Sequence, residues 1–171
     1  MEFYILDPAI NIIDSFKVYE AIIWETKFNE PGSFKASFAF TEKLNQMLQI
    51  GNILYKTDEE EPGIITYKIL KMDAKGNETI QVQGYMASRY FSQRIIWGKM
   101  VMTGTPEIMM RKMIQDQVIS PKDEDRKMPL IRLGEVHNFN VDTIEKQISY
   151  DNLLSALTEL SRISGIGFRL R

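Results

Sequence analysis

Residues Ala21 to Phe40 read AIIWETKFNEPGSFKASFAF, and this stretch decides the fold class. Two β-rich arms flank the segment 29–33, in which Pro31 presets its own φ and Gly32 can take the positive φ of a type II turn. A period of two predicts a β-hairpin with its aromatic side chains on one face. The alternating residues are Ile22, Trp24, Thr26 and Phe28 before the turn, and Phe34, Ala36, Phe38 and Phe40 after it.

The rest of the N-terminal half repeats this pattern of short apolar segments and turns. Thr41 is expected to cap a short helix over residues 42–49, with Leu44, Met47 and Leu48 on its buried side. Short strands joined by turns predict a small antiparallel barrel or sandwich with one helix. The further strands are expected at Glu2–Leu6, Ile10–Ile13, Asn52–Thr57, Ile64–Met72 and Thr79–Tyr85.

The composition changes after Trp97. Residues 98–103 read as a connector, and Thr105-Pro106-Glu107 is a strong start signal for a helix that runs to about Val118. Its inward residues are expected to be Ile108, Met109, Met113 and Ile114. A second amphipathic helix, capped by Ser149 or Asp151, carries a stripe of Leu153, Leu154, Leu157 and Leu160 and ends at Gly165. Candidate strands are Leu130–Leu133, Glu145–Ser149 and Ile166–Leu170.

These elements predict an α+β protein with two domains. Residues 1–98 would form the barrel-like domain, and residues 99–171 a smaller α/β domain with two helices. A final strand normally needs a neighbour, so the chain end at Arg171 favours a domain cut from a longer protein. The strand could equally pair with Leu130–Leu133 and finish there.

Composition and charge argue against several classes of protein. The chain has 171 residues, a formal net charge of -2 and no cysteine. Without cysteine there are no disulfides, thiolate nucleophiles or cysteine metal sites, which fits a reducing cytoplasm. The sequence shows no concentrated basic face, so neither nucleic acid nor an anionic membrane is predicted as a partner. No apolar run reaches the ~20 residues that a membrane helix needs.

A search for catalytic or metal-binding residues finds no motif. His137 is the only histidine and lies in an expected loop. The acidic runs Asp58–Glu61 and Asp123–Asp125 lack the spacing of a calcium loop, and solvated turns explain them better. Gly165-Ile166-Gly167 follows a helix and is no phosphate loop. We therefore expect no catalytic residue, no metal and no cofactor.

Two groups of residues are candidates for a protein interface. Ten methionines are present, and five of them cluster between residues 100 and 113. These five side chains either fill the core or form an adaptable surface for a partner. Arginine and aromatic residues also alternate between residues 89 and 97. This composition favours core packing or a contact between subunits, in which the guanidinium groups of the arginines pair with carboxylates. The candidate interface residues are Arg89, Arg94, Trp97, Met100 and Met102.

The order of several motifs resembles a known family. The series comprises the Trp24 strand, Asn29-Glu30-Pro31-Gly32-Ser33-Phe34, Gly51-Asn52-Ile53-Leu54, Gly84-Tyr85-Met86, Arg94-Ile95-Ile96, Ser149-Tyr150-Asp151-Asn152-Leu153-Leu154 and Gly165-Ile166-Gly167-Phe168. In this order it resembles the N-terminal part of siphophage and prophage tail proteins of the baseplate-hub type. Each motif is a turn or packing element, and together they cover nearly the whole chain.

The resemblance implies a structural protein of the virion tail that is made in the host bacterial cytoplasm. It implies a hub domain pair in a ring, commonly a trimer, that joins the tail tube and distal tail protein to fibres or lysins. It carries over no catalytic residue. Two alternatives stay open: the N-terminal part of a tail-associated peptidoglycan hydrolase with its catalytic domain downstream, and a carbohydrate-binding module that stacks sugars on Trp24, Tyr90 or Trp97.

Overall fold

The computed structural model describes residues 2–17 and 19–171, and these fall into two compact units. The first unit comprises Met1–Lys27, Pro31–Ala87 and Arg169–Arg171, and the second comprises Phe28–Glu30 and Ser88–Phe168. Both units mix helices with antiparallel strands, so the α+β class is confirmed. The domain boundary expected at residue 98 stays a prediction, because two compact units do not show which residues fold independently.

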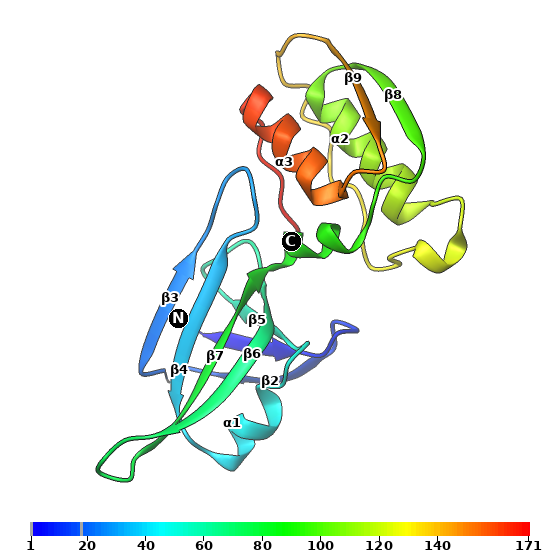
Figure 1. Cartoon of the computed structure of the whole chain (residues 1–171). Coiled ribbons are helices and arrows are strands. Elements are labelled where there is room, and N and C mark those ends of the chain that lie inside the picture. The colour runs from blue at the N-terminus through cyan, green and yellow to red at the C-terminus, as the bar shows by residue number, and fades with distance from the viewer. Residues whose placement is uncertain (1, 18) are drawn as a thin grey trace. The chain divides into compact units, whose positions relative to one another are not determined.

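The first unit is built on a seven-stranded antiparallel sheet in the order β2-β1-β5-β6-β7-β4-β3 (Figure 1). The ring of Phe16 on β2 stacks on Phe3 of β1 at 5.5 Å and meets Phe38 of β4 edge-on at 5.1 Å. Strands from both halves of the sheet therefore enclose one core, as a barrel-like sheet does. The strands are β1 (Phe3–Leu6), β2 (Ile12–Phe16), β3 (Ala21–Glu25), β4 (Ser33–Ala39), β5 (Ile53–Lys56), β6 (Gly63–Met72) and β7 (Glu78–Met86).

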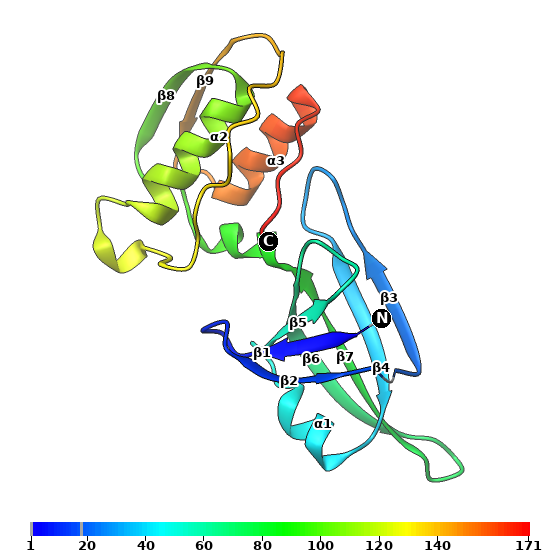
Figure 2. The ribbon, with the colours of Figure 1, turned by 180° about the vertical axis from the view of Figure 1, so that it is seen from behind.

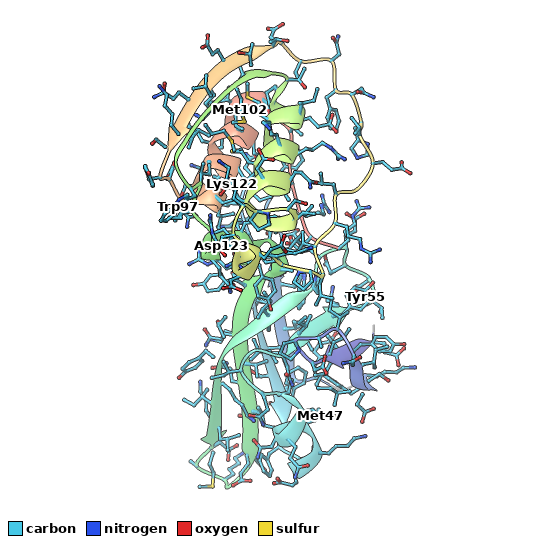
Figure 3. The ribbon with its side chains drawn as sticks, turned by 90° about the vertical axis from the view of Figure 1, so that its right-hand side faces the viewer. Met47, Tyr55, Trp97, Met102, Lys122 and Asp123 are labelled. Carbon is cyan, nitrogen blue, oxygen red and sulfur yellow. The ribbon has the colours of Figure 1, made fainter. Side chains whose placement is uncertain are left out.

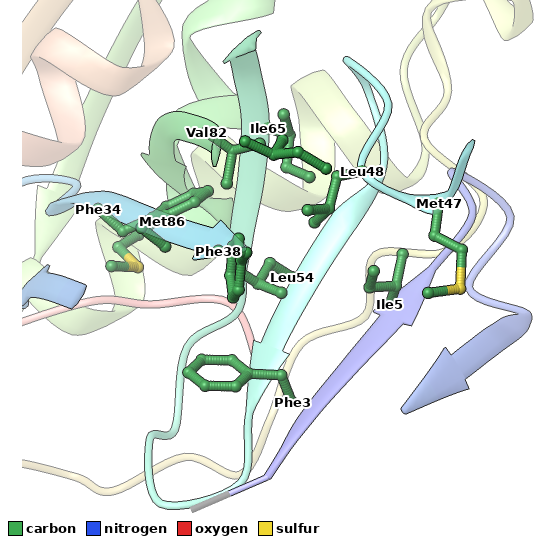
Figure 4. Packing of buried hydrophobic residues seen from close by; sticks show 12 residues of the cluster. Phe3, Ile5, Phe34, Phe38, Met47, Leu48, Leu54, Ile65, Val82 and Met86 are labelled. Atoms are coloured by element: carbon green, nitrogen blue, oxygen red, sulfur yellow. The ribbon is translucent and has the colours of Figure 1, made fainter. Parts of the chain in front are cut away.

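The core of this unit is closed by the helix α1 (Glu42–Met47). The Thr41 side chain accepts the Leu44 N–H at 3.1 Å, which confirms Thr41 as the N-cap. Met47 and the following Leu48 join the buried cluster, which Figure 4 shows from close by. Its other members are Phe3, Ile5, Phe34, Ala36, Phe38, Leu54, Ile65, Ile80, Val82 and Met86.

The expected hairpin between residues 21 and 40 is confirmed as β3 and β4, with Trp24 opposite Phe34. The predicted type II turn is wrong, because residues 26–32 form a longer loop and the φ of Gly32 is not positive. A Cβ atom on Gly32 would lie 1.8 Å from the carbonyl oxygen of Glu25. Close backbone approach is therefore the reason for this glycine.

The second unit packs two helices beside the two-stranded antiparallel sheet of β8 (Lys99–Gly104) and β9 (Ile144–Ser149). Residues 98–103 were expected to be a connector, and this is wrong: β8 pairs with a strand about 45 residues further along the chain. The other elements are η1 (Ala87–Gln93), α2 (Pro106–Ile114), η2 (Gln115–Ile119), η3 (Glu124–Arg126) and α3 (Leu153–Ser164).

The helices follow the expected stripes with three corrections. Met109 and Met113 are buried on α2, but Ile108 is 53% exposed, and the Thr105 side chain makes no capping hydrogen bond. The N-cap of α3 is Asn152, whose side chain accepts the N–H groups of Leu154 and Ser155. The leucine stripe of α3 is buried and Gly165 ends the helix at φ 69°, both as expected.

Three expected strands are wrong in whole or in part. Leu130–Leu133 and Ile166–Leu170 form no strand, and the second strand begins at Ile12 and ends at Phe16. Arg111 on α2 binds the carbonyls of Gly134 and Glu135 just beyond the first segment. Within the expected strands, the Ile131 N–H closes a turn on the Met128 carbonyl at 3.1 Å, and the Ile166 N–H donates to the Ser164 hydroxyl at 3.2 Å. These local contacts use N–H groups that strand pairing would need.

Candidate functional site

The described residues bring Arg94 and Trp97 together with two others, Arg126 and Tyr150, at the end of the two-stranded sheet where β8 begins and β9 ends. We call these four residues the Trp97 patch. The rings of Trp97 and Tyr150 meet edge-to-face, with centroids 5.9 Å apart and planes at 73°. The Arg126 guanidinium lies 5.8 Å from the centroid of the Trp97 ring. Both rings face solvent, Trp97 with 66% and Tyr150 with 64% of its surface exposed.

Backbone contacts hold the two aromatic residues in place. The Trp97 N–H donates to Oε1 of Gln117 on η2 at 3.1 Å, and Gln117 itself is buried. Tyr150 has a φ of 52°, and its N–H donates to the Gly98 carbonyl at 3.3 Å. A non-glycine residue in this left-handed region costs about 1 kcal/mol. The strained turn directs the Tyr150 ring beside Trp97.

The two arginines are fixed by carbonyl oxygens. Arg126 donates to the Ile95 carbonyl at 2.6 Å, and Arg94 Nε donates to the Arg126 carbonyl at 2.7 Å. Within residues 2–17 and 19–171, neither guanidinium forms an ion pair with a carboxylate. Their positive charge therefore stays available to an acidic group outside the chain.

This arrangement suits recognition by contact. Tryptophan, tyrosine and arginine dominate the energetic centres of protein interfaces because they offer large contact areas with polar groups at the end. An edge-to-face pair contributes about 0.5–1.5 kcal/mol and an exposed cation–π contact about 0.5–1 kcal/mol. These contacts hold the rings before a partner arrives, which lowers the entropic cost of binding.

The other predicted interface residues lie elsewhere in the second unit. Arg89 is exposed on η1, Met100 is half-buried on β8, and Met102 is only 5% exposed. Figure 3 shows Met102 among the helices and Trp97 at the outer edge of the ribbon. Their role as interface residues stays a prediction, and burial makes Met102 a poor contact for a partner in this conformation.

Sequence reasoning missed Tyr150 and Arg126. Tyr150 belongs to a motif that the resemblance used, but nothing in the motif indicates a left-handed backbone. Arg126 lies in a charged loop that reads as solvated, and it reaches Trp97 across 29 positions of the chain. The one sequence signal that could have drawn attention to Tyr150 is its position as an aromatic residue directly after the expected strand Glu145–Ser149.

Three residues of the acidic run Asp58–Glu61 are held in ion pairs. Lys56 is buried and pairs with Asp58 at 3.0 Å and Glu59 at 3.1 Å. Glu60 pairs with Arg171 at 3.1 Å and with Arg169. Within the described part of the chain, no group of three or more His, Asp and Glu side chains is placed to hold a metal ion.

A buried carboxylate was not anticipated. Glu107 on α2 is 6% exposed and accepts the N–H groups of His137 at 2.7 Å and Phe139 at 3.5 Å. Burial alone would raise the pKa of Glu107, but the N–H groups of residues 137–139 outweigh it, and the pKa lies below its ordinary value. The Glu107 side chain therefore stays ionised and accepts hydrogen bonds. It is suited to anchoring the loop of residues 137–139 and not to donating a proton.

Comparison with known families covers almost the whole chain. The profile of the family described as Siphovirus ReqiPepy6 Gp37-like protein matches residues 2–171. The chain belongs to this family. Membership confirms the resemblance to siphophage proteins that the motif series indicated. None of the described helices of this Gp37-like chain has the length and apolar character needed to cross a membrane.

The fold of the Gp37-like chain is shared with a solved structure, the prophage tail protein gp18 from Listeria monocytogenes EGD-e. The two match with a TM-score of 0.60 and 12% sequence identity, over 98% of this chain and 47% of gp18. The chain thus spans about half the length of that protein, and at this identity the likeness shows a common fold. No curated protein matches the sequence.

Proposed function

We propose that the Gp37-like chain is a structural component of a phage or prophage tail and belongs to the baseplate hub at the tail tip. Family membership over residues 2–171 carries the proposal, and the fold shared with a prophage tail protein supports it. Its partners would be further copies in a ring, commonly a trimer, and the distal tail, tail tube and fibre proteins. It would reside in the virion tail after assembly in the host cytoplasm.

The Trp97 patch is the surface through which we expect the chain to bind a neighbouring tail subunit. Two exposed rings offer apolar contact, and Arg94 and Arg126 offer charge to a carboxylate of the partner. No catalytic step is required of it. The described side chains instead provide a fixed surface for contact.

Replacing Trp97 by alanine in the phage is expected to reduce the yield of complete tails at least tenfold. The ring is mostly exposed and loses only its contacts with Tyr150 and Arg126, so the free energy of unfolding of the purified chain should fall by about 1–2.5 kcal/mol and the chain should stay folded. The measurement is the count of complete particles by electron microscopy, together with urea unfolding of the variant. The two measurements distinguish a loss of tail assembly from a loss of stability of the chain.

Ile163→Ala serves as the matched control, because Ile163 is 61% exposed on α3 of the same unit and lies outside the patch. It should leave particle yield unchanged. Normal yields for both variants would remove the patch from the assembly surface. Absence of the chain from purified virions would overturn the tail function itself.

The exposed pair of Trp97 and Tyr150 also favours a second function, the binding of cell-wall carbohydrate by ring stacking. A glycan array with the wild type and Trp97→Ala tests it. Binding that Trp97→Ala abolishes would support a receptor-binding module, and no binding by the wild type would end this alternative.

A further inference from the structure

The segment of residues 94–97 has two edges, and one of them pairs with another segment of the chain. It meets residues 151–153 through an isolated antiparallel bridge, with main-chain hydrogen bonds of 2.8 and 2.9 Å. Along an extended chain, the main-chain groups of successive residues point to opposite edges. The Ile95 carbonyl and the Trp97 N–H therefore point to the second edge, where no described strand pairs with the segment.

Two side chains occupy the second edge in place of a strand (Figure 2 shows the ribbon of this unit from behind). The Arg126 guanidinium donates to the Ile95 carbonyl at 2.6 Å, and Oε1 of Gln117 accepts the Trp97 N–H at 3.1 Å. Arg126 is half-buried, whereas Gln117 is only 6% exposed. A hydrogen bond away from water is electrostatically stronger than one at the surface, so Gln117 is the firmer of the two supports.

Packing of the unit does not require an amide at position 117. Leucine has nearly the volume of glutamine and would fill the same space without a polar atom. Burying a polar group costs stability unless the group is hydrogen-bonded, and the Trp97 N–H satisfies the amide oxygen of Gln117. The contact with Trp97 therefore accounts for a buried amide where an apolar side chain would serve the core.

Gln117 is carried by a π-turn of the backbone. η2 follows α2 without a break, and the Ser120 N–H donates to the Gln115 carbonyl, five residues back, at 2.8 Å. An α-helix advances about 100° per residue, so Val118 would point well away from Met113, five residues before it. Both are fully buried. The extra residue of the π-turn gives Val118 the core position and leaves Gln117 beside it, and such turns are frequent at functional sites.

The Trp97 ring depends on its backbone for its position. The ring is 66% exposed and contacts the Tyr150 ring and the Arg126 guanidinium. Tyr150 is held separately, because its own N–H donates to the Gly98 carbonyl. Loss of the hydrogen bond to Gln117 would free one edge of the Trp97 backbone and weaken the contact between the two rings.

We propose that Gln117 is the positioning residue of the Trp97 patch: from the π-turn, its amide oxygen fixes the Trp97 backbone so that the two rings are in place before a partner binds. Its effect on tail assembly rests on the proposed function of the patch. The positioning itself is a property of the purified chain.

Hydrogen exchange of single backbone amides, followed by NMR on the purified chain, tests the contact. In Gln117→Leu the Trp97 N–H should exchange about tenfold faster than in the wild type, because it loses its acceptor. The Ile96 N–H, which donates to the Asp151 carbonyl, should keep its rate and so reports any general loosening of the fold. Gln117→Glu keeps an acceptor oxygen at the same position and should restore slow exchange. Gln117→Asn, one methylene shorter, should behave like Gln117→Leu.

Gln115→Leu is the matched control, because Gln115 lies in the same π-turn and its side chain donates to the Ser120 hydroxyl at 3.0 Å. It should leave the exchange of the Trp97 N–H unchanged. The ring is followed by fluorescence anisotropy decay in a Trp24→Phe chain, in which Trp97 is the one remaining tryptophan. Its ring should move more freely with Gln117→Leu and not with Gln115→Leu. Unchanged exchange in both Gln117→Leu and Gln117→Asn, or equal effects of Gln117→Leu and Gln115→Leu, would overturn the proposal.

The same variants in the phage test the consequence for assembly. Gln117→Leu is expected to lower the yield of complete tails about threefold, since the rings lose their preorganised position, whereas Gln117→Glu and Gln115→Leu should keep it. A normal yield for Gln117→Leu where Trp97→Ala loses tails would overturn the role in assembly. Absence of the chain from virions would instead remove the tail function and leave the contact of Gln117 with Trp97 standing.

Discussion

Gly84→Ala is expected to destabilise the seven-stranded sheet by about 3 kcal/mol or more, since no local shift makes room for the methyl group. Gly84 lies on β7 between Phe34 of β4 and Ile65 of β6. A Cβ atom there would lie 1.8 Å from the Ile64 carbonyl oxygen and 2.6 Å from the Phe34 ring. The backbone of two central strands would have to separate. The measurement is the free energy of unfolding from urea denaturation.

Gly134→Ala is the matched control for this variant. A Cβ atom on Gly134 would meet nothing within 4 Å, and the φ of Gly134 is not in the left-handed region. The same change in composition should therefore alter the free energy of unfolding by less than about 0.5 kcal/mol. Equal losses for both variants would show that the contact of Gly84 with β6 does not hold the sheet together.

The behaviour of the first unit was largely predictable from local pattern. In the expected strand Thr79–Tyr85 the apolar residues Ile80 and Val82 alternate with polar ones, and both are fully buried in the structure. Alternation of this kind depends only on which side of the sheet faces the core, and the sequence states it directly. Turn geometry was less predictable, because the role of Gly32 depends on a carbonyl of the opposite strand.

The second unit was predicted less well because its contacts join distant segments. Its helices followed from apolar spacing, but β8 pairs with a strand beyond α2, η2 and a long loop. The Trp97 patch is likewise formed by segments that are distant in the sequence. Arg94 and Trp97 stood out by their local composition, whereas Arg126 and Tyr150 join them only in the folded chain.

Glu107 is the second residue whose replacement should have a large effect, although its position at the start of α2 suggested only a favourable interaction with the helix dipole. In the structure it anchors the loop of residues 137–139 through backbone N–H groups. Glu107→Gln keeps the shape but removes the charge, and the amide leaves one donor facing N–H groups. We expect a loss of about 1.5–3 kcal/mol in the free energy of unfolding at pH 7.

The pH dependence of this loss identifies its cause. The pKa of Glu107 is lowered in the folded chain, so its carboxylate contributes stability in full above the unfolded-state pKa of about 4.3. That contribution disappears as the pH falls through the lower, folded-state pKa. The difference between the wild type and Glu107→Gln should therefore be constant from pH 5 to 7 and shrink below about pH 4.

Urea unfolding of both chains between pH 3 and 7 measures this difference. Glu135→Gln, an exposed glutamate in the same loop, is the control for a general change in net charge and should follow the wild type throughout. A difference for Glu107→Gln that persists unchanged at pH 3 would show that packing of the amide, and not the ionised carboxylate, determines the loss. In that case the loop would be held mainly by Arg111, which binds the carbonyls of Gly134 and Glu135 from the next turn of α2.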